Sequence, residues 1–443
     1  MNRRTACKLL AGTSGTLLMA PGRSIFGSAM RNPVAGSRLY NHVLEYTRLG
    51  EHRTGTAGDL ATSAWVREKF EAFGLEANLV PVKLNLFEVD SAFIEIDHVR
   101  FRADPEWFPT STPSNGVTAP LRMLSEGEDV SVLRGHIWVT EVQMERPVIP
   151  KEVKERALDA ARAGALGVVM VTRFRTDELT GRGAHGEAGH NKWIPIPLVA
   201  VAAKHKAIVS AAKRGVKARL VVTGTEQPNA NAYNVTGTNT RVNTKAHTEK
   251  GNDAKYIIVT TPQSGMFRCG GERGGGIALL LGLAEWAGRR NGKTRYLFST
   301  NTGHEQSGSG AHKLLEAVPH PDQVAAWLHL GSGMSSWHWR PRKDGTFERY
   351  TEKSGVRNFG ASPSLLPLLS ESFKPIPDLE PQSQRYAGEL RHYIDAGYAS
   401  FGFWGYNQFG HTLADGPEQV SPSLLEPVGE CLVRALEVIE RTI

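Results

Sequence analysis

The sequence is poor in cysteine and has no long apolar run, and both shortages limit what the protein can be. It contains 3 cysteines, Cys7, Cys269 and Cys431, which are too few for a fold built on disulfide bridges. Beyond the N-terminal segment, no stretch reaches the roughly 18 to 20 uninterrupted apolar residues that span a bilayer. Hydrophobic residues still make up 40% of the chain, so we expect a soluble protein with ordinary apolar cores.

Signals of a nucleotide or nucleic-acid partner are also missing. The glycine run at residues 274–276 is not followed by Lys-Ser/Thr, so it does not match a phosphate-binding loop. The formal net charge is +7 at pH 7, but residues 1–29 contain four basic and no acidic residues, and without them it is +3. A charge this small gives no reason to expect nucleic-acid binding.

The N-terminal segment predicts export from the cytoplasm. Arg3 and Arg4 precede a mildly apolar stretch up to Ala20, and the small residues 27–29 suit cleavage. Paired arginines before a weakly hydrophobic stretch resemble a twin-arginine signal, although the basic N-terminus of a cytosolic protein is an alternative. We predict that residues 1–29 are removed and that the mature protein is periplasmic or secreted, without membrane contact.

The length and the pattern of apolar residues indicate two domains. With 443 residues, the chain exceeds what one hydrophobic core usually holds. Helical spacing predicts helices over 38–50 and 59–73, followed by a strand through Val82. Residues 113–224 read as short strands and helices, a module of about 110 residues that is plausible as a domain. From residue 229 onward strands alternate with helices, which predicts a mixed, largely parallel sheet flanked by helices.

Two segments of the module resemble a known kind of domain. Residues 163–169 (AGALGVV) and 196–199 (IPLV) are similar to the protease-associated domain that interrupts the catalytic domain of several zinc exopeptidases. The whole layout resembles this family, which includes secreted leucine aminopeptidases, glutamate carboxypeptidase and glutaminyl cyclase. The resemblance implies an α/β zinc aminopeptidase fold of the phosphorylase/hydrolase-like type. Residues 30–112 and 225–443 would form the peptidase-like domain, and residues 113–224 the inserted, β-rich protease-associated domain.

The resemblance also implies a set of zinc ligands, several of which are exchanged in this chain. The family takes its first ligand from a His-x-Asp motif at a strand end, where this sequence has Thr261. The aspartate that bridges two zinc ions corresponds to Glu272, in the glycine-rich segment 270–276. A Glu-Glu pair that supplies the general base and a ligand corresponds to His304 and Glu305.

Two further ligand positions follow toward the C-terminus. His329 stands where the family has an aspartate at a strand end, and His411, in a His-Thr-x-x-Asp context with Asp415, matches the last histidine ligand. Glu272, Glu305 and His411 thus retain two carboxylates and one imidazole, which suffice for a single zinc with an open position. A second zinc would keep only Glu272 and His329. We therefore predict a mononuclear zinc centre, and a centre without metal is the alternative.

These positions predict a hydrolase of peptides or of other amide-bearing small substrates. Zinc would polarise the carbonyl, His304 would accept a proton, and Arg273 or His329 would stabilise charge on the substrate. Arg273 has two further interpretations, because it can pair with Glu272 and displace the metal, or hold a substrate carboxylate.

The aromatic residues Trp337 and Trp339 are predicted to line a substrate pocket. They precede the stretch Arg340–Asn358, which is rich in charge and predicts a long loop or hairpin near the strand ends. His185 and His190 have ligand-like spacing, but a position on the surface of the inserted domain is the favoured interpretation.

Two other functions stay open at this point. A non-catalytic binding protein, like the transferrin receptor, resembles these peptidases and lacks a working zinc site. Three ligand positions, Thr261, Glu272 and His329, are exchanged here, and so is the general base. A glutaminyl-cyclase-like transferase is a weaker option, because that branch also works with one zinc held by two carboxylates and a histidine.

Overall fold

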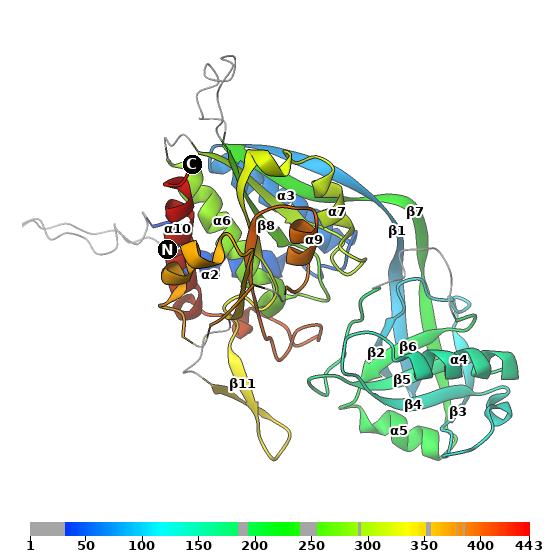
Figure 1. The fold of residues 1–443 in the computed structure, drawn as a ribbon. Helices are drawn as coiled ribbons and strands as arrows, with labels where there is room; N and C mark the ends of the chain where they lie inside the picture. The colour runs from blue at the N-terminus through cyan, green and yellow to red at the C-terminus, as the bar shows by residue number, and fades with distance from the viewer. Residues whose placement is uncertain are drawn as a thin grey trace, which may run out of the picture.

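The computed structural model shows two lobes, as Figure 1 illustrates. The structure describes residues 32–184, 194–239, 255–290, 294–350, 356–377, 379–383 and 386–443. The predicted export signal, residues 1–29, lies outside the described residues, and so do His185 and His190. Within the described ranges, no helix has both the length and the apolar character needed to cross a membrane.

Two long strands run from one lobe into the other. β1 (Leu75–Ile96) and β7 (Lys217–Asn239) pair antiparallel, from Leu75 opposite Asn239 to Glu95 opposite Arg219. The sequence predicted only a strand through Val82. β1 is much longer because β7 offers it backbone partners along almost its whole length, with two irregularities in register on the way.

The larger lobe contains the mixed, largely parallel sheet that the sequence predicts. Its strand order is β1-β7-β9-β8-β10-β15-β13-β14. The central strands run parallel to one another, and they are β9 (Arg295–Asn301), β8 (Tyr256–Pro262), β10 (Val324–Leu330) and β15 (Ser400–Gly405). β13 (Val356–Ala361) lies antiparallel to β15 and pairs on its other side with β14 (Glu380–Gln382).

One face of this sheet is covered by three helices with a common core. α6 (Gly275–Gly288) packs against α2 (Gly36–Arg48) and α10 (Pro422–Glu440), and Leu280 and Leu432 are among the residues they bury. Nearly every side chain of α6 is buried, which is expected for a helix that is apolar on all sides. α3 (Ala57–Ala72) extends this layer along β1 and β7.

The opposite face is covered by two short helices. α7 (Ser309–Leu315) and α9 (Leu390–Asp395) contribute Leu314 and Tyr393 to a smaller core around Trp327 of β10. Helices on both faces agree with the prediction of an α/β domain and place the carboxyl ends of the parallel strands at one edge.

The smaller lobe has a closed arrangement of strands with two helices. Its order is β1-β2-β6-β5-β4-β3-β7, and the pairing of β1 with β7 completes the ring. Its other elements are β2 (Val99–Pro105), β3 (Val117–Arg122), β4 (Ile137–Gln143), α4 (Lys151–Ala163), β5 (Gly167–Arg173), β6 (Leu198–Ala202) and α5 (Lys206–Lys213). The core of this lobe begins before residue 113, because Ile94 and Ala103 pack in it. Its assignment as a protease-associated domain stays a prediction.

A hairpin of β11 (His338–Pro341) and β12 (Phe347–Tyr350) projects from the larger lobe (Figure 1), and it begins two residues before the stretch predicted as a loop or hairpin, residues 340–358. Short helical segments complete the described part: η1 (Val130–Leu133), η3 (Gly270–Gly274), η4 (Pro321–Gln323), α8 (Leu366–Leu369), η5 (Ser370–Phe373) and η6 (Pro417–Gln419). Cys269 and Cys431 are both buried and unbridged.

Candidate metal centre

The carboxyl ends of the parallel strands bring three of the predicted zinc ligands together. Glu272 lies in η3, a π-helical turn that opens α6, Glu305 follows β9, and His411 lies in the loop after β15. One possible ligand atom from each side chain lies within 4.8 Å of the other two. His411 Nε2 is 3.3 Å from Glu272 Oε1 and 3.9 Å from Glu305 Oε2.

These distances suit one metal ion. Oxygen and nitrogen ligands at about 2.0–2.2 Å from a tetrahedral zinc lie about 3.3–3.6 Å from one another. The separations at His411 Nε2 lie close to this range, and Glu305 is fully buried. The three residues therefore fit a single zinc with small adjustments, and the assignment of these residues as ligands stays a prediction.

Arg273 contacts both carboxylates of the same cluster. Its Nη2 donates to Glu305 Oε1 over 2.8 Å and lies 3.2 Å from Glu272 Oε1, while its Nε donates to the backbone oxygen of Ser264 over 3.0 Å. The side chain is 1% exposed. Of the interpretations that the sequence left open, pairing with the carboxylate is the one that the geometry shows. Glu305 Oε1 contacts the guanidinium, whereas Oε2 faces His411.

The charges of this cluster depend on one another. Burial alone would lower the pKa of His411, but the carboxylates of Glu272 and Glu305 raise it to about 9. Burial alone would raise the pKa of Glu272, yet Arg273 and His411 hold it well below its usual range. Two carboxylates are thus balanced by one guanidinium and one imidazolium at neutral pH.

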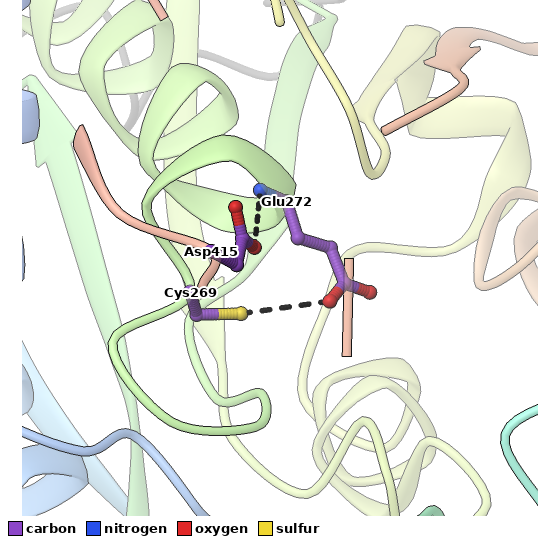
Figure 2. A group of neighbouring side chains, drawn as sticks. All are labelled: Cys269, Glu272 and Asp415. Atoms are coloured by element: carbon purple, nitrogen blue, oxygen red, sulfur yellow. Dashed lines mark hydrogen bonds between the residues drawn. The ribbon is translucent and has the colours of Figure 1, made fainter. Parts of the chain in front are cut away.

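A second group of possible ligand atoms lies beside the first and shares Glu272 with it, and Figure 2 shows its members Cys269, Glu272 and Asp415. Cys269 Sγ donates a weak hydrogen bond to Glu272 Oε2 over 3.7 Å. The two oxygens of Asp415 accept hydrogen bonds from the backbone N–H groups of Gly271 and Glu272 and from the side-chain amide of Asn407. Two of these donors are backbone N–H groups at a helix start, so the carboxylate acts as a cap that fixes η3.

His304, the predicted proton acceptor, is held by a carboxylate that the sequence did not reveal. His304 Nδ1 lies 2.9 Å from Glu389 Oε1, and Glu389 Oε2 accepts hydrogen bonds from Asn301 Nδ2 and the hydroxyl of Tyr393. Burial would raise the pKa of Glu389, but His304 above all, together with His329 and Asn301, lowers it to about 2. Glu389 is far from His304 in sequence and lies in no motif, so only the fold brings the pair together.

His329 is not part of the three-residue cluster. Its Nδ1 lies 3.0 Å from Thr260 Oγ1, and its buried ring contacts Tyr393 of α9. Burial lowers the pKa of His329 to about 4, so the ring is neutral. Thr261, which stands at a lost ligand position, donates its hydroxyl to the backbone oxygen of Leu330 and so ties β8 to β10.

The glycines after Glu272 allow α6 to approach the sheet closely. A Cβ at Gly275 would lie 1.9 Å from the backbone oxygen of Met334, and one at Gly276 would lie 2.7 Å from Thr261 Oγ1. Close packing therefore accounts for this glycine run, as the family resemblance implied.

Trp337 and Trp339 lie at the base of the projecting hairpin. The guanidinium of Arg349 stacks over both rings, 4.6 and 5.5 Å from their centroids, and Trp339 meets Phe409 edge to face. Phe409 is two residues before His411, so this contact makes Trp339 a support of the loop that carries His411. The role of the two tryptophans in a substrate pocket stays a prediction.

The smaller lobe reaches the centre through residues 174–184, which we call the latch segment. The backbone N–H of Gly181 donates to the backbone oxygen of His411 over 2.8 Å, and the N–H of Ala184 donates to that of Glu305, also over 2.8 Å. Two of the three predicted ligands are therefore held by main-chain hydrogen bonds from the other lobe. Nothing in the sequence pattern indicated this contact.

Two arginines fix the latch segment in place. Arg175 donates to the backbone oxygen of Asn407 over 2.6 Å and stacks over Tyr406, in the loop that leads to His411. Arg182 is 3% exposed and pairs with Glu106 over 2.6 Å. Because a buried guanidinium needs its partners, the segment is anchored to both lobes.

Comparison with known proteins supports the architecture. No protein-family model matches the chain, and no curated protein is similar to it in sequence. Among solved structures, BSAP, a zinc aminopeptidase from Bacillus subtilis, superposes with a TM-score of 0.68 at 15% identity, over 91% of this chain and 95% of that one. A peptidase M28 precursor from Shewanella amazonensis gives 0.66 at 14% identity, over 94% and 96%.

An aminopeptidase from Aneurinibacillus sp. strain AM-1 gives a TM-score of 0.57 at 14% identity, with 92% of this chain and 94% of that chain covered. The chain therefore has the fold of the zinc aminopeptidases over most of its length. At this level of identity the likeness establishes the fold, and the chemistry has to be argued from the residues of the centre.

Proposed function

We propose that the protein is an exported hydrolase of peptides or other amide-bearing substrates that works with one zinc ion. The observation that carries this proposal is the convergence of Glu272, Glu305 and His411 at distances that suit a single ion. The zinc aminopeptidase fold and the position at the carboxyl ends of the parallel strands support it. Export through the twin-arginine route is part of the proposal and rests on the sequence of residues 1–29 alone.

In this proposal the residues divide into those that hold the ion and those that handle protons. A zinc ion held by Glu272, Glu305 and His411 would act as a Lewis acid toward the substrate carbonyl. His304 would exchange a proton at Nε2, because Nδ1 faces Glu389. Glu389 would keep the ring oriented and stabilise its protonated form, as a buried carboxylate does for a catalytic histidine.

Stabilisation of charge on the substrate by Arg273 or His329 stays a prediction. Nη2 of Arg273 contacts the two carboxylates and Nδ1 of His329 contacts Thr260, so the other nitrogens of these side chains would have to take this role.

The experiment is to measure zinc in the purified mature protein by elemental mass spectrometry, together with turnover of aminoacyl-amide substrates. We expect about one zinc per chain, lost together with activity in the Glu305→Ala and His411→Ala variants. His320→Ala is the matched control, because His320 is exposed and pairs only with nearby Asp322 among the contacts described. Full zinc content and unchanged turnover in Glu305→Ala would overturn the proposal.

A non-catalytic binding protein is the second candidate, and one observation favours it. Arg273 and the protonated His411 already neutralise Glu272 and Glu305, so the cluster is electrostatically complete without an ion. A folded wild-type protein that takes up no metal at stoichiometric zinc, and that cleaves no amide substrate, would establish this alternative.

A further inference from the structure

The guanidinium of Arg273 lies where it contacts both carboxylates of the centre with one nitrogen. Nη2 is 2.8 Å from Glu305 Oε1 and 3.2 Å from Glu272 Oε1, and the side chain is 1% exposed. Its Nε bond to the backbone oxygen of Ser264 fixes the plane of the group. A single positively charged atom thus bridges two buried carboxylates.

Electrostatics explains why a cation is needed at this point. Two carboxylates buried side by side repel each other and lose their hydration, and an uncompensated pair of this kind would be strongly destabilising. A metal ion between them is one solution. A guanidinium is another, and it carries a permanent charge because it does not lose its proton in proteins.

We propose that Arg273 is a resident cation that takes the place of a second metal ion and limits this centre to at most one ion. It contacts Glu272, which the family resemblance places at the bridging position, and leaves Glu305 Oε2 facing His411. The inference deepens the proposed function by naming the residue that sets the ion count. It rests on that function only for the expected count of one in the wild type.

The contacts of Arg273 place it on the oxygens that a second ion would use. Nη2 contacts Glu272 Oε1 and Glu305 Oε1, so replacing the guanidinium would free both atoms for a metal ion. Among the described residues near the centre, the charge that a second ion would supply comes from Arg273.

The test compares zinc stoichiometry in the wild type, Arg273→Gln and Arg268→Gln, by titration calorimetry and by elemental mass spectrometry after gel filtration in zinc. Arg268 is the matched control, since it lies in the same loop before η3 but is exposed. We expect Arg273→Gln to bind one ion per chain more than the wild type, and Arg268→Gln to bind the same number as the wild type. Equal counts in Arg273→Gln and the wild type would overturn the inference.

This readout separates the inference from the proposed function. One zinc per chain in the wild type and two in Arg273→Gln would support both the resident cation and the zinc hydrolase. No zinc in the wild type and one in Arg273→Gln would support the resident cation and refute the zinc hydrolase. If Arg273→Gln does not fold, the double variant Arg273→Gln/Glu272→Gln decides, because it removes one charge of each sign. Recovery of a cooperative thermal transition in the double variant is the expected result. A double variant that stays unfolded while Glu272→Gln folds would overturn the inference.

Discussion

Zinc binding by this protein should depend steeply on pH, because His411 must lose a proton before its Nε2 can bind an ion. Burial opposes that proton, but the carboxylates of Glu272 and Glu305 raise the pKa of His411 to about 9. At neutral pH the ring is therefore protonated and paired with the same oxygens that would hold the metal. An entering ion has to displace this proton as well as the two ion pairs.

The size of the effect follows from the number of protons released. If one proton leaves for each ion bound, the apparent affinity changes about tenfold per pH unit below the pKa of His411. Between about pH 6 and pH 8 the zinc affinity should therefore rise about 100-fold, which equals about 2.7 kcal/mol. Arg273 adds nothing to this slope, because its guanidinium keeps its charge over the whole range.

Titration calorimetry with zinc at about pH 6, 7 and 8 measures the affinity, and repeating it in two buffers of different ionisation enthalpy counts the protons. We expect close to one proton released per ion at about pH 7. The His320→Gln variant, changed at an exposed histidine, should keep the same slope. An affinity that varies by less than about threefold over this range, or binding without proton release, would refute the reasoning.

The other predictions concern the latch segment, the orientation of His304 and the stability of the metal-free protein. Arg175→Ala removes a charge-assisted hydrogen bond to the loop that carries His411, so zinc affinity should fall about tenfold. Arg162→Ala, which loses an exposed pair with Asp159 in α4 of the smaller lobe, should bind zinc like the wild type. Glu389→Gln should lower kcat roughly 10²- to 10⁴-fold at unchanged KM and zinc content, because the carboxylate orients His304 without touching the substrate; a KM effect alone would contradict this. In the metal-free protein the raised pKa of His411 contributes stability that is fully present below about pH 6.5 and is lost as the pH rises through 9. Urea unfolding in a chelator should show this loss as roughly 3 kcal/mol, and equal stability at both ends of the range would show that the ion pairs contribute nothing.

Much of the fold could be predicted from the sequence because its elements carry strong local patterns. The helices predicted over 38–50 and 59–73 lie within a few residues of α2 and α3. The extent of β1 could not be predicted, since that strand is stabilised by pairing with β7, more than a hundred residues away in the sequence. Local composition does not contain such a partner.

In the candidate centre, too, some residues could be predicted from the sequence and others could not. Glu272, Glu305 and His411 could be placed because each lies in a motif that resembles the family, and the structure brings them together. Glu389 could not be placed, because a lone glutamate at a helix start has no motif and gains its meaning only from its distance to His304. The pairing of Arg273 was left open by the sequence, since adjacency to Glu272 does not show which way a long side chain turns.

The smaller lobe supports the backbone of the candidate metal centre through the latch segment. His411 has a backbone φ of 63°, a left-handed conformation that non-glycine residues seldom adopt and that needs support from its surroundings. That support comes from two directions, because its N–H donates to Glu272 Oε2 over 3.2 Å and its carbonyl accepts from Gly181 of the latch segment. The same segment holds the backbone of Glu305 through Ala184. Any displacement of the smaller lobe relative to the larger one therefore acts on two of the three predicted ligands at once, so the inserted lobe is a structural part of the centre.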